Sequence, residues 1–306
     1  MIKKENLMQK HGIMLMTLAQ EFLNKNEGDR IDTVATMSEK YNMARGTIQT
    51  ALRILQENNA IVLEPRGHLG TFIRYIDYKK LLSLSGIDNI VCVMPLPYTK
   101  RYEGIATGVY NVINKNVQFS LAFMRGSENR LKFLEEGRYD LAIISRLTAN
   151  YYIDNDEKIE IVASLGKQSY VKGHALIVRN DYTDYFKGMK IGIDKSSYDQ
   201  YSLTMNYFKD YDVEFVEIQY SHVVELIQNK ELDAAIWSED ETIYRGKNLK
   251  IIPLENKDKD MLDTEAVIIA DKANNTIINF ITKLIDVEEI LKIQRKVINN
   301  ELVPNY

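Results

Sequence analysis

The segment Tyr41–Gly70 limits the possible folds of this chain most, because it joins an amphipathic helix to a hydrophobic ribbon. Four apolar residues recur at the i, i+3, i+4, i+7 spacing of one buried helical stripe: Ile48, Ala51, Leu52 and Leu55. Ile61–Glu64 and Thr71–Ile73 have the composition of two strands, joined by a turn that contains Pro and Gly. A short helix followed by a hairpin with a basic tip predicts a winged helix-turn-helix.

The exposed arc of this helix carries side chains that can read DNA. In the major groove Arg pairs with guanine and Gln with adenine through two hydrogen bonds each. We therefore expect the helix to read or anchor double-stranded DNA and the hairpin tip to contact backbone or minor groove. The candidate DNA-binding residues are Arg45, Thr47, Gln49, Thr50, Arg53, Arg66 and His68.

The same region resembles the GntR family of winged-helix regulators. Arg30–Ile48, RIDTVATMSEKYNMARGTI, aligns without gaps with the GntR-type pattern RLPSERELAEQFGVSRGTV. The resemblance continues through Ala51–Leu52, Leu55 and the wing that ends Gly70–Ile73, and it implies a GntR-like DNA-binding domain. Without this spacing, an amphipathic helix before an ordinary hairpin in an enzyme would be the simpler interpretation.

The segment departs from the GntR pattern at three places. Ala35 stands where family members often place an arginine on DNA, and Gln49 replaces the second arginine of the recognition helix. The wing, Gly67–Gly70, is one residue longer than the usual Gly-x-Gly. The loss of two cations weakens the attraction for DNA phosphates, so we expect modest affinity for DNA. Alternatively, the DNA site is richer in A·T at the position that Gln49 reads.

Length and composition indicate a two-domain globular protein. The chain has 306 residues, of which 45% are apolar and 27% charged. Its net charge is −4, yet residues 1–75 carry ten basic and eight acidic side chains. This asymmetry favours a polyanion contact in the N-terminal part. We assign residues 1–75 to the DNA-binding domain, 76–87 to a connector and 88–306 to a second domain.

The sequence also predicts a cytoplasmic location. The single cysteine, Cys92, lies in the apolar run Ile90–Met94 and is expected to be a buried structural thiol. The apolar residues of Ile13–Ala19 keep a helical period, and Gln20 and Glu21 follow them without a signal-peptide cleavage site. No apolar run approaches the length of a membrane span.

From Asp88 onward the chain alternates between apolar strands and amphipathic helices, as in Ile90–Met94 followed by Tyr102–Asn114. Such alternation builds an open, mainly parallel sheet. A second alternation begins at Lys190–Asp194. We expect two lobes, lobe one at about 88–179 plus a C-terminal segment and lobe two at about 180–262. Extended segments near Arg146–Arg179 and after Trp237 would join them.

Two phrases in this part resemble the helix–strand units of type II periplasmic-binding proteins, namely RLKFLEEGRYDLAII and VVELIQNKELDAAIW. Each phrase consists of a helix, a charged turn and an apolar strand. The strand follows Asp140 in the first phrase and Asp233 in the second. Together with its GntR-like N-terminal domain, this part makes the whole chain resemble the YhfZ-type regulators. The resemblance implies an α/β multi-domain protein, in which a winged helix-turn-helix precedes a two-lobed, type II periplasmic-binding-protein-like effector domain.

Polar residues follow the predicted strands at the edge where open α/β sheets bind ligands. Serine hydroxyls and helix N–H groups at such an edge suit a carboxylate, sulfate or phosphate. The candidate ligand-binding residues are Tyr98, Thr99, Ser127, Ser145, Arg146, Ser196, Ser197 and Trp237. The alternatives are N-capping for serines such as Ser127 and Ser221, a surface cation for Arg146, and core packing for Tyr98 and Trp237.

No catalytic, metal or cofactor motif is apparent. His11, His68, His174 and His222 lack metal-ligand spacing, and the chain has no GxSxG, GxGxxG or phosphate-loop motif. We therefore expect a regulator, not an enzyme, that acts as a homodimer and binds a small effector between the lobes. Two other interpretations stay open: an enzyme that uses the cleft, or a second domain kept only for dimerisation.

Overall fold

The computed structural model describes residues 10–156, 158–181, 186–240, 249–254 and 261–306. The chain forms two compact units. The first contains Met1–Ile90, Ile113–Ser120 and Asn274–Leu284, and the second contains Val91–Val112, Leu121–Ala273 and Ile285–Tyr306. Among the described residues, no helix is both long and apolar enough to cross a membrane.

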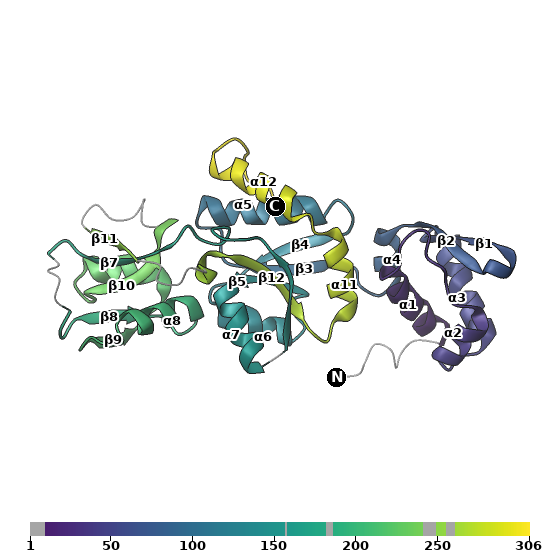
Figure 1. Cartoon of the computed structure of the whole chain (residues 1–306), viewed down its shortest axis with the longest axis horizontal. Coiled ribbons are helices and arrows are strands. Elements are labelled where there is room, and N and C mark those ends of the chain that lie inside the picture. The colour runs from purple at the N-terminus through teal and green to yellow at the C-terminus, as the bar shows by residue number, and fades with distance from the viewer. Residues whose placement is uncertain (1–9, 157, 182–185, 241–248, 255–260) are drawn as a thin grey trace. The chain divides into compact units, whose positions relative to one another are not determined.

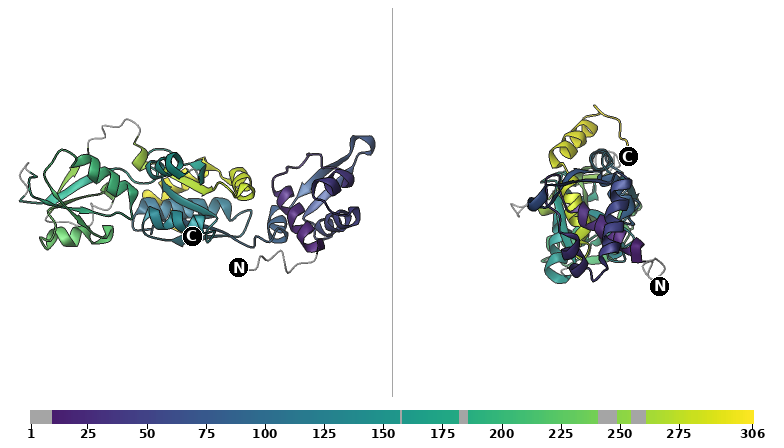
Figure 2. Two further views of the ribbon diagram at one scale, coloured as in Figure 1. Left: turned by 90° about the horizontal axis from the view of Figure 1, so that it is seen from below. Right: turned by 90° about the vertical axis from the view of Figure 1, so that its right-hand side faces the viewer.

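The N-terminal part of the first unit, here called the head, is a three-helix domain with a two-stranded ribbon that extends beyond its helices (Figures 1 and 2). Its elements are α1 (Lys10–Leu23), α2 (Val34–Lys40), α3 (Arg45–Glu57), β1 (Ile61–Pro65) and β2 (Thr71–Ile76). The strands pair antiparallel, with Ile61 opposite Ile76. The predicted helix-turn-helix and wing are confirmed.

Local sequence explains the elements of the head. The hydroxyl of Thr33 accepts a hydrogen bond from the backbone N–H of Thr36 at 3.1 Å, which caps α2. The predicted stripe of α3 is buried, from Ile48 to Leu55. An isolated bridge between Arg30 and Phe72 adds the segment before α2 to the ribbon alongside β2.

The predicted connector contains a packed helix, α4 (Tyr78–Leu84). Asp77 caps it by accepting from the N–H of Lys80 at 3.1 Å, and the hydroxyl of Tyr78 donates to the carbonyl of Lys25 at 3.0 Å. In the same unit, Phe280 of α11 (Asn275–Leu284) packs against Tyr78 with ring centroids 5.6 Å apart. Because α4 packs in this way, residues 76–87 do not have the composition of a flexible linker.

The first lobe is built on a five-stranded sheet (Figure 1). Its strand order is β4 (Phe119–Phe123), β3 (Ile90–Met94), β5 (Leu141–Ser145), β12 (Ala266–Asp271) and β6 (Ile159–Ser164). β3 and β5 are parallel, whereas β12 runs antiparallel to both β5 and β6. The sheet is therefore mixed: β3, β5 and β6 run in the expected common direction, and β12, which returns from the second lobe, inserts in the opposite direction.

Helices cover both faces of this sheet. α5 (Lys100–Ile113) and α12 (Val287–Ile298) lie on one face, and α6 (Ser127–Glu135) and α7 (Arg146–Asp156) lie on the other (Figure 1). α7 corrects the expectation of an extended segment from Arg146 onward. On the first face, a Cβ at Gly108 would lie 2.8 Å from the carbonyl oxygen of Ile290, so glycine lets α5 and α12 approach closely.

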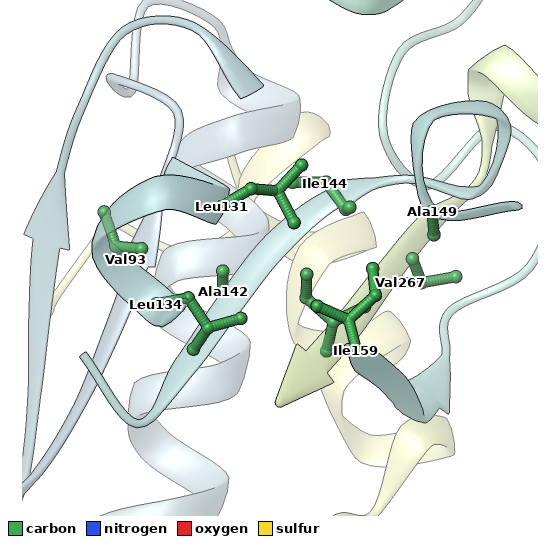
Figure 3. Close-up of a cluster of buried hydrophobic side chains, with 9 residues drawn as sticks. Val93, Leu131, Leu134, Ala142, Ile144, Ala149, Ile159 and Val267 are labelled. Carbon is green, nitrogen blue, oxygen red and sulfur yellow. The ribbon is translucent and has the colours of Figure 1, made fainter. Parts of the chain in front are cut away.

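The core on the α6 and α7 side is formed by small and branched side chains from strands and helices (Figure 3). Leu131 and Leu134 of α6 and Ala149 of α7 pack onto the strand residues. The strand side chains are Val93, Ala142, Ile144, Ile159, Val267 and Ile269. The predicted apolar strands thus form the centre of the lobe.

The second lobe contains a mixed five-stranded sheet with helices α8 (Tyr198–Tyr207) and α9 (Val223–Gln228). Its strand order is β11 (Leu249–Pro253), β7 (His174–Arg179), β10 (Ala234–Ser238), β8 (Lys190–Ile193) and β9 (Glu214–Glu217). We expected Ala175–Arg179 at the end of lobe one, but β7 pairs here with β10 and β11. The chain crosses between the lobes before His174.

Candidate functional site

The first candidate surface is the exposed side of α3. Arg45, Gln49 and Arg53 are exposed, whereas Thr47 and Thr50 are half-buried. Nη1 of Arg53 lies 3.0 Å from Oε1 of Glu57, one turn later on the same helix. The helix therefore presents two guanidinium groups and an amide on one side, and one of the two guanidinium groups is already paired.

The wing places Arg66 and His68 at an exposed tip. The guanidinium of Arg66 lies over the ring of Phe72, 4.7 Å from its centroid, and Nη2 is 3.3 Å from Oε2 of Glu64. Arg74 of β2 is also exposed, although the sequence analysis did not single it out. Arg74 directly follows the GntR-like segment, and its sequence position does not by itself indicate DNA binding.

The second candidate site is a cavity of about 680 Å³ in the second unit, lined by residues of both lobes. Four of the predicted ligand-binding residues line it: Tyr98, Ser127, Ser196 and Ser197. The other four, Thr99, Ser145, Arg146 and Trp237, do not appear in its wall. The structure therefore brings together half of the predicted set.

Each of the other four residues has a structural partner. The hydroxyl of Thr99 accepts from the backbone N–H of Tyr102 at 3.2 Å at the start of α5. Nε of Arg146 lies 2.6 Å from Oε1 of Glu265. The hydroxyl of Ser145 donates to Asp199, and Trp237 packs in the core of the second lobe against Tyr220, with ring centroids 5.0 Å apart.

Two arginines that the sequence analysis did not select line the cavity. Arg125 is exposed, and Nε and Nη1 donate to the hydroxyls of Tyr98 and Ser221 at 2.9 and 3.0 Å. Arg130 is only 4% exposed; Nη1 donates to the carbonyl of Met124 at 2.8 Å and Nη2 to the hydroxyl of Tyr170 at 3.1 Å. Neither has an acidic side chain within 4.0 Å in the described part of the chain.

The sequence did contain a signal for Arg130. The buried residues of α6 fall at i, i+3, i+4 and i+7, and they are Ser127, Arg130, Leu131 and Leu134. An arginine at a position of the buried stripe must have a reason to be there, because a buried charge is costly unless it is compensated. Arg130 is the fourth residue of α6 and does not directly follow a strand, so a search of strand ends does not find it.

The opposite side of the cavity carries carboxylates. Asp194 accepts hydrogen bonds from the N–H and hydroxyl of Ser196 and from the N–H of Tyr220, at 2.7 to 2.9 Å. Glu217 lies 2.8 Å from Nζ of Lys195. Burial raises the pKa of the Asp199 carboxyl, while hydrogen bonds from Ser145 and Thr148 oppose the rise.

The lobes contact each other directly beside the cavity. The ring of Tyr151 on α7 stacks on that of Tyr198 on α8, with centroids 4.1 Å apart. The N–H of Tyr198 donates to the hydroxyl of Ser127 at 3.2 Å. His174, also in the cavity wall, lies with Nδ1 2.6 Å from Oδ2 of Asp263. Within the described ranges, no three His, Cys, Asp or Glu side chains cluster as metal ligands would.

Comparisons with known proteins identify two regions of the chain. Residues 26–73 match a helix-turn-helix domain model, and residues 77–306 match the YhfZ C-terminal domain. The chain is 32% identical to YhfZ of Escherichia coli K12 over 306 residues, which cover 99% of this chain and 100% of that protein. The GntR resemblance of the head stays a prediction.

Two solved structures are similar to a large part of this chain. The crystal structure of YhfZ from Shigella flexneri is 34% identical, covers 74% of this chain and 97% of its own, and has a TM-score of 0.64. AbpA, an amino acid transporter substrate-binding protein from Streptococcus pneumoniae bound to L-arginine, is 15% identical with a TM-score of 0.53. It covers 71% of this chain and 96% of its own, and this likeness concerns the fold alone.

Proposed function

The chain belongs to the YhfZ family, and from this membership we propose that it is a DNA-binding transcription regulator whose C-terminal domain binds a small, anionic effector. The observation that carries the proposal is the presence, in one chain, of a helix-turn-helix head and a solute-binding-protein-like domain with a cavity between its lobes. DNA binding implies that the protein acts in the cytoplasm.

The side chains on the exposed side of α3 support the proposal that this helix reads a DNA site as a GntR-type recognition helix does. Arg45, Gln49 and Arg53 would contact bases or phosphates, with Thr47 and Thr50 in support. Arg66 and His68 of the wing would contact the backbone or minor groove. The protein would bind a near-palindromic site as a homodimer, because two-fold symmetric regulators bind symmetric half-sites.

The composition of the cavity supports a polar, anionic effector. Among the described residues, the two arginines that line it have no acidic partner, and Ser127 and Ser197 also line it. We propose that the effector bridges the lobes and changes the balance between two conformations of the effector domain, and thereby the affinity of the head for DNA.

A binding selection from random double-stranded DNA, made with the full chain, tests the DNA proposal. The wild type is expected to enrich a symmetric sequence, and the double variant Arg45→Ala/Arg53→Ala is expected to lose this enrichment. A matched control, Arg138→Ala/Lys187→Ala, removes two exposed cations from the second unit and should leave the selected sequence unchanged. Equal selection by all three proteins would contradict the proposal.

The competing functions make different predictions. If the cavity belonged to an enzyme, the protein would turn over a bound compound, and substitutions at Arg45 and Arg53 would have no effect on that turnover. If the second domain served only for dimerisation, no small molecule would raise the melting temperature of the full chain.

A further inference from the structure

Arg130 is a buried cation with incomplete compensation. Its side chain lines the cavity and is 4% exposed, and its Nε has no hydrogen-bond acceptor among the described residues. The groups that it does contact, the carbonyl of Met124 and the hydroxyl of Tyr170, carry no formal charge. A buried charge without a counter-charge is unfavourable, so Arg130 at this position indicates an anion that the described residues do not supply.

The N-terminus of α6 faces the same cavity. α6 has nine residues, and its N-cap Gly126 and first residue Ser127 line the cavity beside Arg125. In the described part of the chain, the backbone N–H groups of Ser127 and Asn129 have no acceptor. Free N–H groups at a helix N-terminus attract anions, and here they lie between the cations at 125 and 130.

The acidic residues of the cavity do not cancel these cations. Asp194 keeps its charge, but it accepts from donors of the second lobe and pairs with neither arginine, and Glu217 is paired with Lys195. Burial raises the pKa of Asp199, which favours its uncharged form. The lobe-one wall of the cavity is therefore left with positive charge.

The arginine that the sequence suggested cannot take this role. Nε of Arg146 is held 2.6 Å from Oε1 of Glu265, and the backbone N–H of Arg146 donates to the carbonyl of the same residue at 2.8 Å. Arg146 is thus compensated within the chain and does not line the cavity.

We propose that Arg130 and the first turn of α6 bind an oxyanion of the effector, a carboxylate or a phosphate group, with Arg125 as a second cation at the same group. The proposal rests on the proposed function, because it assigns the chemistry of the effector to one wall of the same cavity. A guanidinium presents parallel N–H groups to two oxygens of such an anion.

Thermal unfolding of the full chain tests this assignment. Sodium phosphate, sodium acetate and sodium succinate are each compared with sodium chloride at equal ionic strength, for the wild type, Arg130→Met, Arg130→Lys and Arg146→Met. We expect at least one oxyanion to raise the melting temperature of the wild type by about 2 °C or more at saturating concentration. The phosphate and carboxylate arms show which oxyanion the site prefers.

The variants separate binding from folding. Arg130→Met should lose the oxyanion response, and Arg130→Lys, which keeps the charge but not the planar fork, should retain part of it. Arg146→Met should melt lower in chloride but keep the full response. If no oxyanion stabilises the wild type, or if Arg130→Met responds like the wild type, the assignment is overturned. Selection of a DNA sequence would still support the regulator, so the two failures are distinguishable.

Discussion

The hydroxyl of Ser145 in the first lobe donates a 2.6 Å hydrogen bond to Oδ1 of Asp199 in the second lobe. The hydroxyl of Thr148 donates to the same oxygen at 2.9 Å. The carboxyl of Asp199 is buried, so a single acidic group with two donors joins the lobes beside the cavity. Its ionisation state therefore bears on the stability of the joined lobes.

Asp199→Asn tests this relationship through the pH dependence of stability. Burial raises the pKa of Asp199 above 3.8, so the folded state holds this proton more tightly than the unfolded state. Its contribution to stability is fully present below pH 3.8 and is lost as pH rises through the raised pKa. The melting temperature of Asp199→Asn relative to wild type should therefore increase from about pH 4 to about pH 7.

Asp199→Asn can still accept from Ser145 and Thr148, so the prediction concerns charge and not loss of contacts. The matched control is Asp181→Asn, a substitution at an exposed carboxylate whose pKa is lowered by Arg179. Its melting temperature relative to wild type should not rise with pH. A constant difference between Asp199→Asn and the wild type across this range would contradict the prediction.

The ion pair of Arg146 and Glu265 should stabilise the first lobe. Glu265 is 8% exposed, and its Oε1 also accepts from the hydroxyl of Ser164 at 2.5 Å. Glu265→Gln leaves Arg146 without its counter-charge, and we expect a loss of about 1–3 kcal/mol in the free energy of unfolding. Urea denaturation of Arg146→Met, Glu265→Gln and the double variant measures the coupling, and strictly additive losses would contradict it.

Gly70 should be irreplaceable in the wing. Its φ is +99° and its ψ −161°, a region that only glycine occupies easily, and a Cβ there would meet Nε of Arg30 at 2.6 Å. Gly70→Ala should destabilise the ribbon by about 1–3 kcal/mol. Hydrogen exchange of the amides from Ile61 to Ile76 in the full chain measures this loss.

The control for this prediction lies three residues earlier. Gly67 has a φ of +56°, and a Cβ there would meet no atom within 4 Å. Asn tolerates this left-handed conformation, so Gly67→Asn should cost less than about 1 kcal/mol. Equal exchange rates in the two variants would contradict the assigned role of Gly70.

Releasing Arg53 should strengthen DNA binding. Glu57→Gln removes the carboxylate that lies 3.0 Å from Nη1 of Arg53 and also removes a negative charge from α3, the helix proposed to contact DNA. We expect a gain of about 2–5-fold in affinity for the selected sequence at low salt. Fluorescence anisotropy over a salt series measures it, with Glu288→Gln in α12 as the charge-matched control. Weaker binding by Glu57→Gln would argue against contact between this face and DNA.

Local patterns predicted most of the fold. The stripe of Ile48 to Leu55 and the cap at Thr33 depend on residues within one or two turns, so the sequence alone specified the helix-turn-helix. The apolar strands were also predicted, because strands buried on both faces are continuous hydrophobic runs. Strand direction was not predictable in this way, since the insertion of β12 between β5 and β6 depends on residues far apart in the chain.

The same distinction holds for the candidate site. The sequence by itself determined that serines and arginines stand near the ends of strands. Only the tertiary structure decided which cation is compensated, because Glu265 reaches Arg146 across 119 positions and none of the described acidic residues reaches Arg130. Charge compensation depends on distances of a few ångströms between side chains, and such distances do not exist until the lobes have folded.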